Sequence, residues 1–254
     1  MNCWLDGRSV PSSAIPVRTG TAPFETMGAR AAEVPLWERH LARLRDSAAR
    51  LGLPFTPAPE LRSQAQELLR GNGHHDGVLR LLLLPSGSAV HTVLTTRARS
   101  PITRMQLLPT VVPRPADAPP GDCKAEPRAF YEAVRQQAQD GGADDGIVVG
   151  SDGAVLEASF GTLWLRLQGR WVTPALDGRV LPGIGRALLL AAAARRGLHI
   201  EERLCDLGDL HRAEALAHGN AVYGPRPASL CGTAPAVAIV DSELGALWRI
   251  AATD

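Results

Sequence analysis

Residues 121–128 read Gly-Asp-Cys-Lys-Ala-Glu-Pro-Arg and contain Lys124, the single lysine of the chain. All the other basic residues among the 27 lysines and arginines are arginines. Arginine can replace lysine in surface ion pairs but not where a deprotonatable amine is needed, because a guanidinium stays charged and is a poor nucleophile. An amine can condense with a carbonyl to form a Schiff base, or transfer a proton. Lys124 is therefore either a residue needed for its reactive amine or a lysine that remains by chance in an arginine-biased sequence.

The lysine follows a segment rich in proline and arginine, residues 98–121, and we place a domain junction near residues 100–102. Residues 1–100 predict a small N-terminal α+β domain. Apolar side chains at helical spacing indicate its helices, and short apolar runs bounded by turn residues indicate its sheet. The expected helices cover 35–51 and 59–70, and the expected paired strands cover 78–84 and 90–95.

Residues 101–254 predict a larger C-terminal domain that carries Lys124. A helix is expected directly after the lysine, over 128–139, because two glycines follow it. A second helix is expected after Leu181-Pro182-Gly183 and ends at a glycine. Residues 219–227 contain two glycines and two prolines and predict an irregular loop.

Composition narrows the possible functions. The 254 residues suffice for two domains with cores of their own. A formal net charge of +1 gives no electrostatic basis for binding nucleic acid or an anionic membrane. The four cysteines lack metal-ligand spacing and His74-His75 lies among turn residues, so no metal is expected. The start lacks a signal-peptide pattern and the longest apolar run, 187–194, is too short to cross a bilayer, so we expect a cytoplasmic protein.

Several short motifs occur in an order that resembles the class IV aminotransferase family, the fold-type IV pyridoxal-phosphate enzymes. They are Phe24-Glu25-Thr26, His40-Leu41-Ala42-Arg43-Leu44, Lys124, Glu157-Ala158-Ser159, Thr173-Pro174, Leu181-Pro182-Gly183-Ile184-Gly185-Arg186 and Asn220-Ala221. Each is weak alone, but together they span most of the chain and include its single lysine. The resemblance implies a two-domain α/β (α+β) fold of the D-amino-acid-aminotransferase type, with pyridoxal 5'-phosphate as cofactor.

The resemblance also implies roles for the matched residues. Lys124 matches the catalytic Schiff-base lysine. Glu157 matches the carboxylate that pairs with the pyridine nitrogen and keeps it protonated. A carboxylate in so apolar a strand would be costly to bury without a cationic partner. The other cofactor-binding residues that the resemblance implies are Arg43, Ile184 and Gly185 at the phosphate, together with Asn220 and Ala221.

Two of the arginines need comment. Arg43 shares its helix with three other arginines, and without the family pattern nothing distinguishes it from a solvated side chain. Arg186 lies in the first turn of its expected helix, where a cation opposes the helix dipole unless a negative group lies nearby. We interpret that placement as mild support for an anion bound at the helix start.

The chain departs from the family pattern at four places. Thr21-Ala22-Pro23 replaces Gly-Asp-Gly before the first motif, Thr162 replaces a common Asn, and Gly185 replaces the usual Thr. The connection Pro85–Ser88 is short where many members have a longer glycine-rich loop. The first and last departures concern the substrate more than the cofactor.

Local sequence favours the lyase branch of the family, that is 4-amino-4-deoxychorismate lyase. Arg128 follows the lysine by four residues, and Asn220-Ala221-Val222 is similar to that branch's Asn-Ala-Leu. Branched-chain aminotransferases more often have Ser-Gly-Thr there and a tyrosine where this chain has Ala129. A branched-chain or D-amino-acid type aminotransferase, and a degenerate relative that binds the cofactor without turnover, are the alternatives. The expected partners are a small-molecule amino substrate and a second copy of the chain, without nucleic acid or membrane.

Overall fold

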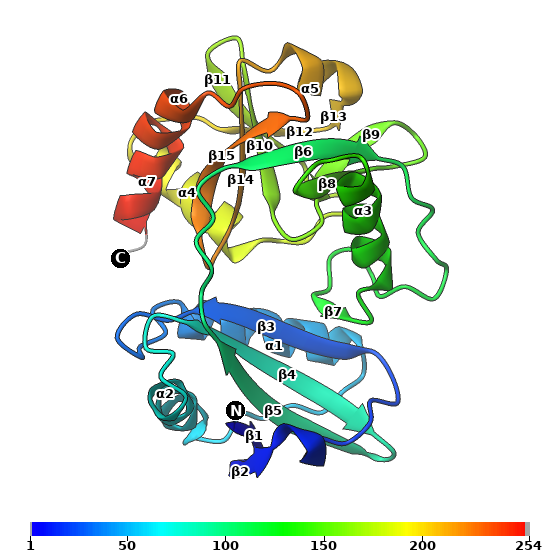
Figure 1. Ribbon diagram of the computed structural model, residues 1–254, viewed down its shortest axis with the longest axis vertical. Coiled ribbons are helices and arrows are strands. Elements are labelled where there is room, and N and C mark those ends of the chain that lie inside the picture. Colours follow the sequence, from blue (N-terminus) through cyan, green and yellow to red (C-terminus); the bar gives the residue numbers. More distant parts are fainter. Residues whose placement is uncertain (1, 252–254) are drawn as a thin grey trace. The chain divides into compact units, whose positions relative to one another are not determined.

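The chain forms two compact units (Figure 1), and the computed structural model describes residues 2–251. The first unit extends to Ser100 and also includes Cys123–Pro127, whereas the second comprises Pro101–Asp122 and everything from Arg128 onward. The boundary after Ser100 lies at the expected junction. The placement of Lys124 in the larger domain was wrong, because strand β7 (Ala125–Glu126) pairs with strand β3 of the first unit.

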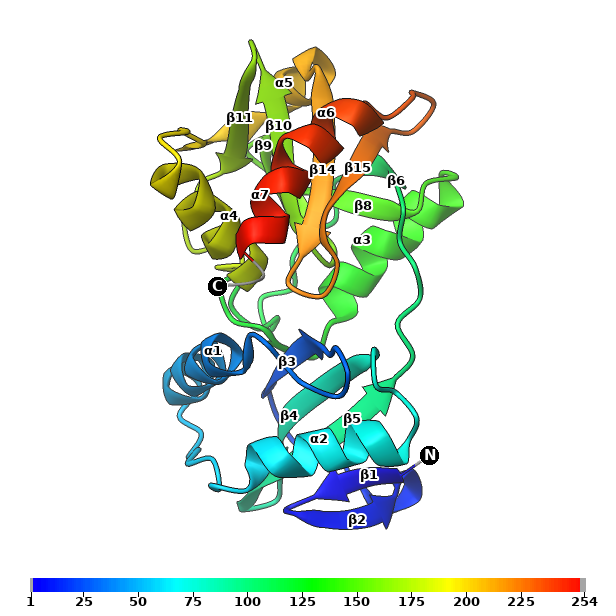
Figure 2. The same ribbon diagram turned by 90° about the vertical axis from the view of Figure 1, so that its left-hand side faces the viewer.

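The first unit is a six-stranded antiparallel sheet in the order β2-β1-β5-β4-β3-β7, and two helices lie on one face of it (Figure 2). A hairpin at Asp6-Gly7, both residues with positive φ, joins its first two strands. The elements are β1 (Asn2–Leu5), β2 (Arg8–Pro11), the short helix η1 (Ser12–Ala14), β3 (Ala22–Gly28), α1 (Trp37–Arg50), α2 (Leu61–Gly71), β4 (Val78–Ser86) and β5 (Ala89–Arg97).

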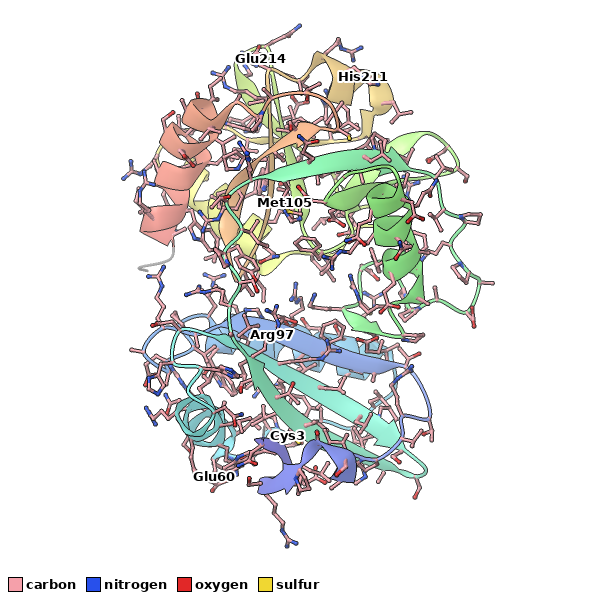
Figure 3. All side chains as sticks on the ribbon, in the orientation of Figure 1. Cys3, Glu60, Arg97, Met105, His211 and Glu214 are labelled. Atoms are coloured by element: carbon pink, nitrogen blue, oxygen red, sulfur yellow. The ribbon has the colours of Figure 1, made fainter. Side chains whose placement is uncertain are left out.

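Alternation along the strands explains how this sheet packs. Leu79, Leu81 and Leu83 of β4 are fully buried and point to the same face, as successive odd positions in a strand must. The apolar stripes of α1 and α2 cover that face, so strands and helices share one core. Cys3 of β1, labelled in Figure 3, is also buried, one strand in from the edge strand β2.

The second unit contains a nine-stranded mixed sheet in the order β12-β11-β10-β14-β15-β6-β8-β9-β13. Its core is a cluster of buried aliphatic side chains that includes Met105, also labelled in Figure 3. The strands are β6 (Met105–Thr110), β8 (Asp145–Val149), β9 (Ala154–Ala158), β10 (Thr162–Leu167), β11 (Arg170–Pro174), β12 (Glu201–Arg203), β13 (Cys205–Asp206), β14 (Ala215–Asn220) and β15 (Gly224–Leu230). The helices are α3 (Ala129–Asp140), α4 (Ile184–Arg195), α5 (Leu207–Arg212), α6 (Val237–Ser242) and α7 (Leu244–Ala251).

The expectation of an irregular loop over 219–227 was wrong, because most of that segment belongs to β14 and β15. Its two prolines, Pro225 and Pro227, are two residues apart, so their missing N–H groups face the same side of the strand. On one side β15 pairs with β14, and on the other it pairs with β6 only from Ala228 onward. The prolines therefore remove few hydrogen bonds between β15 and its neighbouring strands.

A buried polar group lies within the second unit. Asp145 of β8 is fully buried and accepts a hydrogen bond from the Ser159 hydroxyl. Its other oxygen, Oδ2, lies 4.0 Å from Nε2 of the buried His218, and neither atom has a hydrogen-bond partner among residues 2–251. Burial raises the pKa of Asp145 to about 6 and lowers the pKa of His218 to about 4. Both shifts favour the uncharged forms.

Asp145 should make stability depend on pH in a defined direction. Its folded pKa of about 6 exceeds the unperturbed 3.8, so its contribution is fully present below pH 3.8 and is lost as pH rises through 6. The free energy of unfolding of Asp145→Asn should therefore rise relative to that of the wild type by up to about 3 kcal/mol between pH 4 and pH 7. Urea unfolding at a series of pH values measures this difference. Asp144→Asn at the exposed neighbouring residue is the control, and a difference independent of pH would contradict the assignment.

Candidate active site

The structure places the lysine beside the first of the sequence motifs. The Phe24 N–H donates to the Lys124 carbonyl over 2.9 Å, which extends the pairing between β3 and β7. The Lys124 Nζ then lies 4.8 Å from the centre of the Phe24 ring, and the Arg80 guanidinium lies 3.9 Å from the same centre. Arg80 also forms an ion pair of 2.5 Å with Glu126. Lys124 is therefore half-buried, and its amine lies against an aromatic ring that a second cation also contacts.

Arg43 differs from the other arginines of α1. Its side chain is 13% exposed, whereas Arg39, Arg45 and Arg50 are exposed to solvent. Both oxygens of the buried Glu25 accept from it, with Nε to Oε1 at 2.7 Å and Nη2 to Oε2 at 2.6 Å. This bidentate pairing occupies one edge of the guanidinium. Low exposure and pairing with Glu25 thus distinguish Arg43 from the other arginines of α1, which the sequence alone did not do.

Glu157, in the second unit, is a buried carboxylate at the end of β9 and is 6% exposed. The Tyr131 hydroxyl donates to its Oε1 over 2.7 Å, and the Leu181 backbone N–H donates to its Oε2 over 3.3 Å. Burial and the neighbouring Glu157 raise the pKa of Tyr131, so this hydroxyl stays protonated and remains a donor. The carboxylate is held in place from two sides by α3 and by the segment that precedes α4.

Two arginines flank the ring of Tyr131. The Arg128 guanidinium lies 4.1 Å from the ring centre and also donates to the Ser159 carbonyl over 2.5 Å. The Arg114 guanidinium lies 5.6 Å from the same centre. Both cations therefore lie close to the ring that holds Glu157.

The helix start expected at the phosphate is formed by Gly183, Ile184 and Gly185. Gly183 is the N-cap of α4, and no side chain caps the helix there. A Cβ atom at Gly185 would lie 3.0 Å from the Asn220 carbonyl carbon and 3.1 Å from the Ala221 nitrogen. The missing side chain lets the loop after β14 approach the helix start closely. The backbone of Gly185 is thus brought together with that of Asn220 and Ala221 within the second unit.

Two details of this region differ from expectation. Arg186 is buried and forms an ion pair of 2.7 Å with Glu202, and it donates to the Pro174 carbonyl. Glu202 supplies the negative group that its position requires, so Arg186 is not evidence for a bound anion. The Asn220 side chain is turned into its own loop, where Oδ1 accepts from the Val222 and Tyr223 N–H groups. Asn220 shapes the loop with its side chain.

Sequence reasoning missed three residues at these positions: Glu25, His40 and Tyr131. Glu25 and His40 lie within quoted motifs but were given no role, because a strand residue and a helix residue meet only in the folded chain. Tyr131 could have been noted as an aromatic in the first turn of the helix after the lysine. Among residues 2–251 there is no group of three or more His, Cys, Asp or Glu side chains suited to holding a metal ion.

Comparison with known proteins identifies a family for this chain. The family described as amino-transferase class IV matches residues 22–231. A Thermotoga maritima protein assigned as a branched-chain-amino-acid aminotransferase is 24% identical over 186 residues, which cover 70% of this chain and 65% of that protein. The match thus spans less than two thirds of that relative.

Two solved structures share the fold. One is assigned as a 4-amino-4-deoxychorismate lyase from Legionella pneumophila, with 21% identity, a TM-score of 0.82, and coverage of 94% of this chain and 97% of that one. The other is a hypothetical aminotransferase from Mycobacterium tuberculosis in its PLP-bound form, with 22% identity, a TM-score of 0.83, and coverage of 99% and 98%.

The chain belongs to the class IV aminotransferase family, since the family match covers most of its length. This is a family of pyridoxal-phosphate-dependent enzymes. The structure, with its two sheets, has the fold of the solved structures named above. The expected family and the expected mixed α/β fold are thereby confirmed. No helix in the described part of the chain is long and apolar enough to cross a membrane.

The close approach at Gly185 predicts the effect of adding a methyl group. Gly185→Ala should destabilise the second unit by about 1–3 kcal/mol, because backbone atoms at Asn220 and Ala221 must move. Gly245→Ala is the matched control, since Gly245 is also helical and its nearest contact would be at an ordinary 3.5 Å. Urea unfolding of both variants compares them. Equal stability of the two variants would show that the loop yields without cost.

Proposed function

We propose that this chain is a pyridoxal-phosphate-dependent lyase that releases pyruvate and 4-aminobenzoate from 4-amino-4-deoxychorismate, in the synthesis of folate. One observation carries the choice of substrate: Arg114 and Arg128 flank the Tyr131 ring, whose hydroxyl holds Glu157. This substrate carries two carboxylates, which arginines bind well. A branched-chain amino acid has one carboxylate and an apolar side chain, so its carboxylate would account for one of these two cations only.

The residues present fit the cofactor. A unique amine, Lys124, supplies the group that binds its aldehyde, and the buried Glu157 supplies a carboxylate for its pyridine nitrogen. Arg43 supplies a guanidinium for the phosphate. At the start of α4, a Cβ at Gly185 would fill the space that the backbone of Asn220 and Ala221 now approaches. No side chain caps this helix start, and uncapped N–H groups such as those of Ile184 and Gly185 bind anions.

Each residue then has a defined task. When bound, the cofactor supplies an electron sink for the bond broken at the carbon that bears the substrate's amino group. Glu157, fixed by Tyr131 and by the Leu181 N–H, holds the proton at the pyridine nitrogen. The Lys124 Nζ removes the proton from the substrate carbon. The C–O bond between the ring and the enol side chain then breaks, and the ring that remains is aromatic. The released enolate takes up a proton and becomes pyruvate.

Lys124 should carry the cofactor covalently. Purified protein, or protein incubated with pyridoxal phosphate, should absorb near the visible edge, and borohydride should leave a pyridoxyl group on the peptide that contains Lys124. Lys124→Arg keeps the charge and should lose the adduct, because a guanidinium does not condense with the aldehyde. Absorbance and peptide mapping measure both. A wild-type protein that takes up no chromophore would refute the cofactor assignment.

The reaction is tested by supplying 4-amino-4-deoxychorismate and measuring pyruvate and 4-aminobenzoate together. Equal amounts of both products support the lyase. If the protein instead converts amino acids to oxo acids and yields no pyruvate from this substrate, it is an aminotransferase. A cofactor-loaded protein inactive in both assays would be the non-catalytic relative.

Glu157→Gln should separate binding from turnover. The amide keeps the shape and can accept from Tyr131, so cofactor affinity should be preserved. Turnover should fall about a hundredfold, because a neutral amide does not hold the pyridine nitrogen protonated. Glu132→Gln, at an exposed position of α3, is the control. Arg43→Ala should show the reverse pattern, with weaker cofactor affinity as its main effect.

We further propose a homodimer in a reducing, cytoplasmic setting. Closed two-fold pairing is the commonest arrangement of soluble oligomers. The four cysteines are all free, which suits a reducing compartment. Light scattering at micromolar concentration should give about twice the chain mass of 27.0 kDa. A value near one chain mass would exclude the dimer.

A further inference from the structure

Glu25 lies at the centre of a buried polar group in the first unit. It is 1% exposed and comes from β3, whose neighbouring positions Phe24 and Met27 belong to the apolar interior. Three donors reach its two oxygens: Nε and Nη2 of Arg43, and the ring nitrogen Nδ1 of His40 at 2.7 Å. His40 and Arg43 are three residues apart in α1, so they project from the same side of the helix.

The hydrogen bonds fix the state of each group. The Arg43 guanidinium, which bonds to Glu25 over 2.6–2.7 Å, and the His40 donor together hold the pKa of the Glu25 carboxyl at about 2 despite burial, so it is ionised. Burial lowers the pKa of His40, whose side chain is 1% exposed. Nε2 of His40 has no hydrogen-bond partner in the described part of the chain. A neutral ring with its proton on Nδ1 fits this arrangement, because a second N–H would be a buried charged donor.

The arrangement fixes the orientation of the Arg43 guanidinium. Glu25 accepts hydrogen bonds from Nε and Nη2, which form one side of the fork. His40 in turn keeps the carboxylate from rotating, because it donates to Oε2, which Nη2 also reaches. A guanidinium that is held in one plane loses less conformational entropy when it binds a phosphate.

We propose that Glu25 and His40 are positioning residues that orient Arg43 for the phosphate of the cofactor. This inference rests on the function proposed above. It differs from a merely structural role, in which the buried ion pair would only attach α1 to β3. A positioning role affects ligands that carry the phosphate, whereas a structural role affects every ligand and the fold alike.

The test compares pyridoxal phosphate with pyridoxal, which has the aldehyde and ring but no phosphate. The full chain is freed of cofactor, and dissociation constants for both ligands are measured by absorbance for the wild type, Glu25→Gln and His40→Leu. Each variant should weaken pyridoxal phosphate by about tenfold or more, the equivalent of one charge-assisted hydrogen bond. Pyridoxal affinity should stay within about twofold of the wild type. Glu38→Gln, at an exposed position of α1, is the matched control and should change neither affinity.

A conservative variant keeps the test valid if Glu25→Gln folds poorly. His40→Asn retains an N–H donor near the position of Nδ1 but leaves a cavity, whereas His40→Leu fills the space without a donor. Under the proposal His40→Asn keeps the preference for pyridoxal phosphate and His40→Leu loses it. Arg43→Ala should lower the preference as well, and Glu25→Gln should lower it no further in that background.

Several outcomes would overturn the inference. Equal weakening of both ligands in Glu25→Gln and His40→Leu would assign the group a structural role only. The same conclusion follows if His40→Asn is as poor as His40→Leu, or if both variants keep the wild-type preference. Failure of the cofactor assignment looks different, since the wild type itself would then bind neither ligand. Failure of the lyase assignment alone would leave the preference of the wild type for pyridoxal phosphate intact.

Discussion

The pairing of β3 with the two residues of β7 is the contact on which the chemistry of the first unit depends. Its register places Ala22 opposite Glu126 and Pro23 opposite Ala125, and the next bond ties Phe24 to the Lys124 carbonyl. A segment distant in sequence is thereby added to the edge of the sheet. Because strand residues alternate in direction, the same register that turns Phe24 toward the amine turns Glu25 toward α1.

Buried carboxylates illustrate how the fold accommodates charge in three different ways. Glu25 stays ionised because a guanidinium and a ring N–H surround it. Asp145 accepts a hydrogen bond from the Ser159 hydroxyl and lies near the His218 imidazole, but burial outweighs its polar contacts and its pKa rises to about 6. Glu157 is fixed by a phenol and a backbone N–H, which each donate to one of its oxygens. Environment, more than residue type, decides what each acid can do.

Much of the architecture could be predicted from the sequence because helices and strands follow local apolar periodicity. The helices over α1, α2, α3 and α4 and the strands of the first hairpins agree with their sequence patterns. Two predictions were wrong for the same reason. Prolines obscured the strand pattern of β15, and the short strand beside Lys124 gave no sign of the unit to which it belongs. Both depend on pairing with residues distant in sequence. The motif order indicated the family, but no spacing of residues along the sequence predicts that Glu25 contacts His40 and Arg43.

The close approach of residues 220–221 to Gly185 has a consequence for how this sequence can change over time. Because backbone atoms already occupy the volume where a side chain at 185 would begin, a larger residue could not replace the glycine alone. The loop would first have to move away, and Asn220, which fixes it through bonds to Val222 and Tyr223, would have to change with it. Substitutions at the two segments are therefore coupled, and a change in the loop has to precede one at the glycine.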